Sequence, residues 1–106
     1  MRLTGKVAVV TGAGQGMGRA IAQRFADEGA IVVAVDLNEE AAKQTLEGKS
    51  GKHLARSVNV GDSAAIDTLF AEIKQNLGPV DVLVNNAGVG SVDQVADITD
   101  ATWKRD

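Results

Sequence analysis

The sequence predicts an α/β fold in which strands and helices alternate and all strands run parallel. Four short apolar segments rich in β-branched residues are separated by segments with helical spacing of apolar side chains. Strands and helices that alternate in this way are joined by right-handed crossovers within one sheet. The 106 residues, 44% hydrophobic and 24% charged, fit one globular domain.

The first unit begins with Val7–Thr11, an apolar run that predicts a strand buried on both faces of the sheet. From Met17 to Glu28 apolar side chains recur at helical spacing. Gly29 follows at the position where a helix C-terminus favours a left-handed residue. Ile31–Asp36 repeats the apolar pattern and predicts a second buried strand.

The second unit is marked by a helix cap. Asn38 precedes Glu39 and Glu40, whose charges are favourable near the positive end of a helix dipole. This pattern predicts a helix that follows Asn38 and runs to about Leu46. His53–Val60 predicts a third strand, with a weaker pattern because polar residues interrupt it.

The third predicted helix carries the clearest apolar stripe in the sequence. Asp62 or Ser63 can cap it, and Gly78 and Pro79 end it. The stripe has three- and four-residue spacing and consists of Ile66, Leu69, Phe70, Ile73 and Leu77.

Val80–Asn85 predicts a fourth strand, followed by a loop over residues 86–99 and a helix that contains Trp103 and is capped by Thr99 or Asp100. We expect a Rossmann-type three-layer sandwich with the strand order 3-2-1-4. The reversal after the third strand leaves a crevice at the carboxyl ends of the first and fourth strands, where such sheets bind ligands.

Glycine is concentrated in Thr11–Gly18, the turn between the first strand and the first helix. The chain turns sharply there, and a Cβ atom would keep the backbone away from a ligand and the helix away from the sheet. The helix N-terminus offers unpaired amides to a phosphate. Because Gly18 is followed by Arg19 and Ala20, a Walker loop is excluded. The pattern Thr-Gly-x-x-x-Gly-x-Gly predicts a site for the pyrophosphate of a nicotinamide dinucleotide; a purely structural turn is the alternative.

Asp36 ends the second predicted strand, twenty positions after Gly16. An acid there can accept hydrogen bonds from the adenosine ribose hydroxyls, each worth about 1.5–3 kcal/mol. The same charge repels a 2′-phosphate, and the neighbouring Gln15 and Leu37 supply no compensating cation. We therefore predict NAD in preference to NADP. The alternative role of Asp36 is to cap the following helix.

With these motifs in place, the chain resembles the classical short-chain dehydrogenase/reductase family over essentially its whole length. The resemblance rests on the glycine turn, on Asp36, on Asn59–Asp62 after the third strand and on Asn85–Gly88 after the fourth. It implies an NAD-dependent oxidoreductase that interconverts an alcohol and a carbonyl. Residues 1–106 would be the N-terminal NAD-binding part of a single Rossmann-fold domain.

The resemblance also assigns roles to individual residues. The backbone around Gln15, Gly16 and Met17 is expected to meet the pyrophosphate, and Asn59 the adenine. Many relatives have Asp in place of Asn59, and an amide can also pair with the adenine amino group. For Asn85 a structural role is as plausible as ligand contact. The expected cofactor-binding residues are Gly12, Gln15, Gly16, Met17, Gly18, Asp36, Leu37, Asn59, Val60, Asn86, Ala87 and Gly88.

Catalysis is expected to need residues outside this chain. The family uses a tyrosine, a lysine four positions later, a serine and an asparagine, and the sequence contains no tyrosine. We therefore predict no catalytic residue here, a missing C-terminal catalytic half and an inactive 106-residue chain. Ser91 and Asp93 lie near the expected crevice without a base or lysine nearby, and His53 is expected to be structural.

Composition narrows the remaining choices. The absence of cysteine and the single histidine exclude thiolate and histidine-rich metal sites. The net charge of −3 and the lack of a long apolar run argue against nucleic acid and membrane partners. We expect a cytoplasmic protein that binds a dinucleotide and, in a full-length parent, a small alcohol or carbonyl substrate. We also expect self-association through the exposed edge of the fourth strand. The alternative function is a stand-alone or excised nucleotide-binding module without catalysis.

Overall fold

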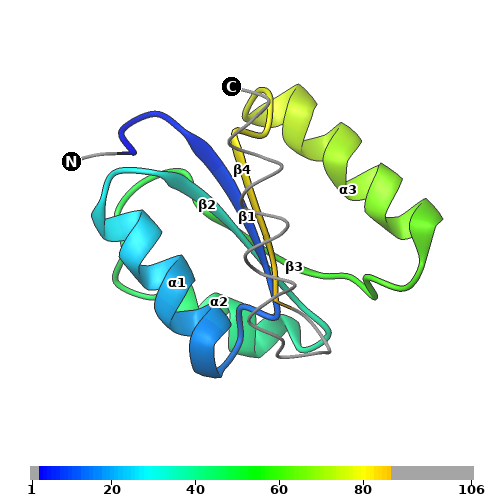
Figure 1. The fold of residues 1–106 in the computed structure, drawn as a ribbon, viewed down its shortest axis with the longest axis horizontal. Helices are drawn as coiled ribbons and strands as arrows, with labels where there is room; N and C mark the ends of the chain where they lie inside the picture. The colour runs from blue at the N-terminus through cyan, green and yellow to red at the C-terminus, as the bar shows by residue number, and fades with distance from the viewer. Residues whose placement is uncertain (1–2, 87–106) are drawn as a thin grey trace.

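Strands and helices alternate throughout residues 3–86, the part of the chain that the computed structural model describes (Figure 1). The elements are β1 (Val7–Thr11), α1 (Gly16–Asp27), β2 (Ile31–Asp36), α2 (Glu39–Leu46), β3 (Leu54–Ser57), α3 (Ser63–Asn76) and β4 (Val82–Asn85). The predicted helix around Trp103 and the residues Ala87, Gly88, Ser91 and Asp93 lie outside the described residues.

The four strands form one parallel sheet in the order β3-β2-β1-β4, which confirms the predicted topology. Helices α1 and α2 cover one face and α3 covers the other, so the described part has three layers (Figure 1). The strands β1 and β2 alternate between the layers because successive side chains point to opposite faces. Thus Ala8 and Val10 belong to the core beneath α1 and α2, while Val7 and Val9 pack with Leu69 of α3.

The third and fourth strands are shorter than the sequence pattern predicts. β3 ends at Ser57 because its partner strand ends at Asp36, with which Ser57 is paired. At the other end His53 precedes the strand, and its ring Nδ1 accepts a hydrogen bond from Val32 N at 3.0 Å. β4 begins at Val82 rather than two residues earlier.

The start of β4 is joined to β1 by a reciprocal pair of hydrogen bonds. Val7 N donates to the Asp81 carboxylate at 2.9 Å, and Asp81 N donates to the Val7 carbonyl at 2.8 Å. The Asp81 side-chain oxygen thus accepts the hydrogen bond that a backbone carbonyl of the neighbouring strand would otherwise accept. Asp81 therefore stabilises the sheet although it lies outside β4.

The helix ends follow the expected signals. The Asn38 side chain accepts a hydrogen bond from Ala41 N at 3.1 Å, as predicted. Of the two candidate caps for α3, Asp62 is the one used, because its carboxylate accepts from Ala65 N at 3.2 Å. After α1, Gly29 adopts φ +94°, in the left-handed region.

An ion pair fastens α3 to the edge strand β3. Arg56 donates to both carboxylate oxygens of Glu72, with the shortest contact 2.6 Å from Nη2 to Oε2. These hydrogen bonds lower the pKa of Glu72 and raise the pKa of Arg56. No helix within residues 3–86 has the length and apolar character needed to span a bilayer.

Candidate functional site

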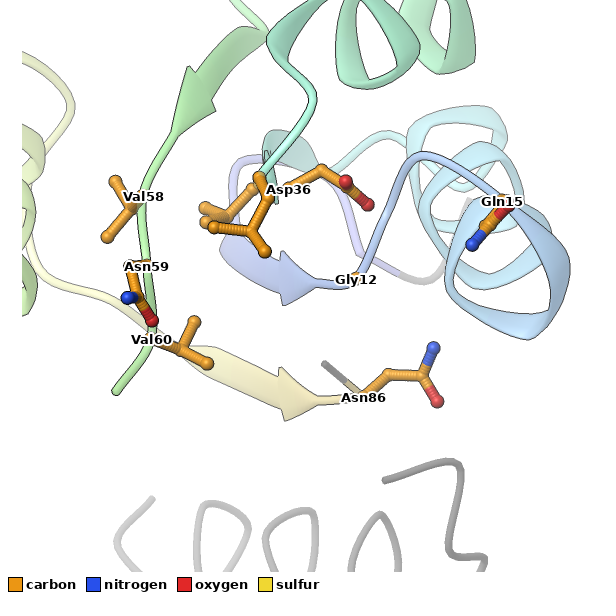
Figure 2. A pocket seen from close by; sticks show the side chains of 9 residues that line it. Gly12, Gln15, Asp36, Val58, Asn59, Val60 and Asn86 are labelled. Atoms are coloured by element: carbon orange, nitrogen blue, oxygen red, sulfur yellow. The ribbon is translucent and has the colours of Figure 1, made fainter. Parts of the chain in front are cut away.

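A pocket of about 390 Å³ opens at the carboxyl ends of the strands (Figure 2). It is lined by Gly12, Gln15, Val35, Asp36, Leu37, Val58, Asn59, Val60 and Asn86. All of these except Val35 and Val58 are among the residues predicted from the sequence to bind a cofactor. The sheet therefore brings segments that lie up to 74 positions apart to one site, as expected for this edge of a parallel sheet.

The glycine turn before α1 has the close packing that its composition predicts. Gly12 and Gly16 adopt φ +64° and +58°, in the region that favours glycine. A Cβ atom at Gly18 would clash with the Gly12 carbonyl oxygen and would lie 2.8 Å from Asn86 Nδ2. Glycine at this position allows α1 to pack directly against the turn and the end of β4.

The N-terminus of α1 adjoins the pocket through its N-cap residue, Gln15, which belongs to the lining. Gln15 is the N-cap residue but makes no side-chain cap hydrogen bond, and the first turn contains no acidic residue. The first amides of a helix have no partner within the helix and carry the positive end of its dipole. This N-terminus therefore fits an anionic group such as a phosphate.

Asp36 uses both carboxylate oxygens to hold neighbouring backbone. Its Oδ2 accepts a hydrogen bond from Gly14 N at 2.9 Å, and its Oδ1 accepts one from Asn38 N at 3.0 Å. Figure 2 shows the carboxylate directed toward the glycine turn. The alternative role as cap of α2 is wrong, because Asn38 caps that helix. The carboxylate is half-buried in the pocket wall, and each oxygen retains a lone pair for a ligand hydroxyl.

Two exposed apolar side chains, Leu37 and Val60, line the pocket. Within residues 3–86 the exposed large apolar side chains are Met17, Leu37 and Val60, with exposed fractions of 49%, 72% and 36%. All three are residues predicted to bind a cofactor. Exposed apolar side chains such as Leu37 and Val60 in the lining of a concave polar site are typical of a ligand site rather than of an ordinary surface.

The segment after β3 is fixed by its own hydrogen bonds. Asn59 Oδ1 accepts from Gly61 N at 2.9 Å, which leaves the Asn59 Nδ2 group as a donor. Ser57 Oγ donates to the Leu37 carbonyl at 2.8 Å and so joins the ends of β2 and β3. Val58 also lines the pocket and was not predicted to do so; its two-residue spacing from Val60 was the available signal.

The ends of β1 and β4 are joined by one hydroxyl group. Thr11 Oγ1 donates to Asn85 Oδ1 at 2.9 Å and accepts from Asn86 N at 2.9 Å. Asn85 thus has the structural role that the sequence left open. The described residues contain no group of three or more His, Asp or Glu side chains arranged to hold a metal ion.

Comparison with known proteins gives consistent matches. The family model described as short chain dehydrogenase matches residues 6–105. The meso-2,3-butanediol dehydrogenase of Serratia marcescens is 42% identical over 106 residues, which cover 99% of this chain and 42% of that protein. The chain spans about two fifths of the length of the curated relatives it matches.

Solved structures agree with these sequence matches. A hydroxysteroid dehydrogenase from Escherichia coli has 40% identity and a TM-score of 0.78 over 85% of this chain and 40% of its own. A metagenomic short-chain oxidoreductase in complex with NADP has 36% identity and a TM-score of 0.79, over 84% of this chain and 42% of its own.

Proposed function

We propose, from the premise that the chain belongs to the short-chain dehydrogenase family, that it is the dinucleotide-binding part of an NAD-dependent oxidoreductase. The reaction would interconvert an alcohol and a carbonyl. Residues 1–106 would form the N-terminal portion of a single Rossmann-fold domain. The catalytic residues would lie in a C-terminal half outside this chain, so the 106 residues alone would be inactive.

One observation carries the proposal: Asp36 and Gln15, the N-cap residue of α1, line the same pocket. A dinucleotide presents ribose hydroxyls and an anionic pyrophosphate close together, and these two protein groups have the complementary chemistry. The turn between them is so closely packed that a Cβ atom at Gly14 would lie 2.8 Å from Asp36 Oδ2.

Each part of the dinucleotide is assigned to a group of the cofactor-binding residues predicted from the sequence. The backbone of Gln15, Gly16 and Met17 would hold the pyrophosphate, with Gly12 and Gly18 shaping the turn. The ribose and adenine would be held by Asp36, Leu37, Asn59 and Val60, and the nicotinamide side by Asn86, Ala87 and Gly88. When bound, the nicotinamide supplies or accepts the hydride of the reaction.

A preference for NAD over NADP follows from the charge at the ribose position. The Asp36 carboxylate would accept hydrogen bonds from ribose hydroxyls and would repel a 2′-phosphate. The neighbouring residues Gln15 and Leu37 are neutral, so neither offsets this repulsion. One of the similar solved structures contains NADP, so the cofactor preference of this chain needs its own test.

Thermal unfolding with NAD and with NADP tests the cofactor proposal. At a free concentration of 100 times the dissociation constant, NAD should stabilise the fold by about 2.7 kcal/mol. Equal stabilisation by both dinucleotides would contradict the preference, and no stabilisation by either would contradict the cofactor site. An alcohol-oxidation assay with NAD tests the other half, because turnover by the 106-residue chain would refute the predicted inactivity.

We further propose that the protein works in the cytoplasm and that copies of this chain associate through β4. The support for association is that β4 pairs only with β1 in the described sheet, and an unpaired strand edge is a template for another chain. Sedimentation of the 106-residue chain at high concentration should show dimers or larger species, and a clean monomer would rule the association out.

A further inference from the structure

Thr45 is a completely buried polar residue on α2 that lies outside the pocket lining. Its hydroxyl group donates a hydrogen bond to the Ala13 carbonyl oxygen at 2.6 Å and lies 3.1 Å from the Ala41 carbonyl oxygen, one turn earlier in α2. Gln23 of α1 donates from Nε2 to the Thr45 carbonyl at 3.2 Å. Through these hydrogen bonds Thr45 connects α2 both to the glycine turn and to α1.

The bond from Thr45 fixes one end of a peptide group whose other end is held by Asp36. The Ala13 carbonyl and the Gly14 amide belong to one planar unit, because the C–N bond between them has partial double-bond character. The carbonyl accepts from Thr45 Oγ1, and the amide donates to Asp36 Oδ2 at 2.9 Å. Two anchors at opposite ends of a rigid plane set its orientation.

The two anchors differ in what else they do. Asp36 lines the pocket and, by the proposed function, shares its carboxylate with the cofactor ribose. Thr45 has no exposed surface and so no contact with a ligand in the pocket. Within residues 3–86, the hydrogen-bond partners of Thr45 outside α2 are the Ala13 carbonyl of the turn and the side chain of Gln23.

We propose that Thr45 is a positioning residue for the dinucleotide. It holds the Ala13–Gly14 peptide from the side away from the pocket, so that the amides that follow stay directed at the pyrophosphate while Asp36 binds the ribose. This inference rests on the proposed function and deepens it. It also explains a hydroxyl at a core position of α2, since a valine of similar volume would leave the Ala13 carbonyl without this partner.

The test compares three variants of the 106-residue chain by calorimetric titration with NAD and, separately, with adenosine, which has no pyrophosphate. Thr45→Val removes the hydroxyl, and Thr45→Ser retains it. Thr68→Val is the matched control, because Thr68 is exposed on α3 and, in the part of the chain that the structure describes, its hydroxyl bonds only to the Ala64 carbonyl one turn earlier, at 3.0 Å. Circular dichroism establishes that each variant is folded.

We expect Thr45→Val to weaken NAD binding about fivefold to tenfold, the effect of one hydrogen bond. Thr45→Ser and Thr68→Val should stay within about twofold of the wild type, and adenosine affinity should change by less than about twofold in every variant. A loss of NAD and adenosine affinity by the same factor would indicate general loosening and overturn the positioning role.

The remaining outcomes are distinguishable. If the wild type binds NAD and folded Thr45→Val binds it equally well, the inference fails and the proposed function stands. If the wild type binds no NAD, both fail together. If Thr45→Val does not fold, Thr45→Ser decides: wild-type NAD affinity supports the inference, and a loss of about tenfold in a folded Thr45→Ser chain overturns it.

Discussion

The substitution Asp36→Asn tests both tasks assigned to this side chain, because it keeps the shape and removes the charge. In the wild type both carboxylate oxygens accept from backbone amides, Oδ2 from Gly14 and Oδ1 from Asn38. An amide side chain has one acceptor oxygen and one NH₂ donor. One of the two backbone amides must therefore lose its partner and face another donor.

The stability effect follows from which partner is lost. The contact with Asn38 N is exposed, so water can replace it, and the variant side chain should keep its oxygen on Gly14. The loss is then one solvent-exposed hydrogen bond to a charged group, and we expect a decrease of about 1 kcal/mol in the free energy of unfolding. For a domain of this size that lowers Tm by about 5 °C.

The effect on binding is larger and depends on the cofactor. NAD should bind about tenfold more weakly, because its ribose hydroxyls lose a charged hydrogen-bond acceptor that contributes about 1.5 kcal/mol to the binding free energy. NADP should bind more tightly, because its 2′-phosphate no longer faces a negative charge. Two unit charges about 5 Å apart repel each other by about 1 kcal/mol at the dielectric constant of water and by about 3 kcal/mol at that of a protein surface. The ratio of NAD to NADP affinity should therefore fall by at least about tenfold.

Urea unfolding and calorimetric titration with both dinucleotides measure these effects. Asp67→Asn is the control, since Asp67 is exposed on α3 and the change in net charge is the same. The control should change the free energy of unfolding by no more than about 0.5 kcal/mol. It should leave the ratio of NAD to NADP affinity unchanged. If Asp36→Asn leaves the affinity ratio at its wild-type value, the assignment of Asp36 to the ribose is refuted.

Three further substitutions test the framework around the site. Glu72→Gln should lower stability by about 0.5–1 kcal/mol near neutral pH, because the pair with Arg56 is one-third exposed. The folded pKa of Glu72 lies below its ordinary value of 4.5, so the difference from wild type should be full above pH 4.5 and vanish as the pH falls through the folded pKa. His53→Ala should cost about 1–2 kcal/mol, since the amide of the buried residue Val32 loses its acceptor. Gly18→Ala should cost about 1–3 kcal/mol or more, because its Cβ would clash with a backbone carbonyl of the glycine turn.

Urea unfolding curves measure all three effects, the first as a function of pH. A pH-independent difference for Glu72→Gln would show that the ion pair does not stabilise the fold. Wild-type stability of His53→Ala would mean that water satisfies the strand amide equally well. A fully stable Gly18→Ala chain would show that α1 can move away from the turn at no cost.

The parts of the fold that local chemistry determines were predictable. β1 and β2 have the predicted bounds, because a strand buried on both faces needs an uninterrupted apolar run. The caps at Asn38 and Asp62 follow from side chains that accept from nearby amides. The end of β3 was not predictable, because it depends on where β2 stops offering partners and not on the residues of β3 themselves.

The candidate site divides in the same way. Glycines and an acid at strand ends are typical of few sites other than a ligand site, so the turn and Asp36 could be predicted from the sequence. Thr45 was missed because its partner Ala13 lies 32 positions away and the contact exists only once α2 has packed on the turn. A hydroxyl at a core-facing helical position was the only signal, between Ala42 and Leu46 in the same apolar cluster.

The bonds that tie β4 to β1 have a consequence for the order in which the chain assembles. They join residues 74 positions apart at both ends of the strand, whereas partners in β1 and β2 are 24 positions apart. Closing the longer loop costs about 1 kcal/mol more in chain entropy. We expect β1, α1 and β2 to associate while the chain is still being synthesised, and β4 to dock last of the four described strands. Hydrogen exchange at the Val7 amide, whose acceptor is Asp81, would then report the detachment of β4. The amides that join β1 and β2 would exchange more slowly.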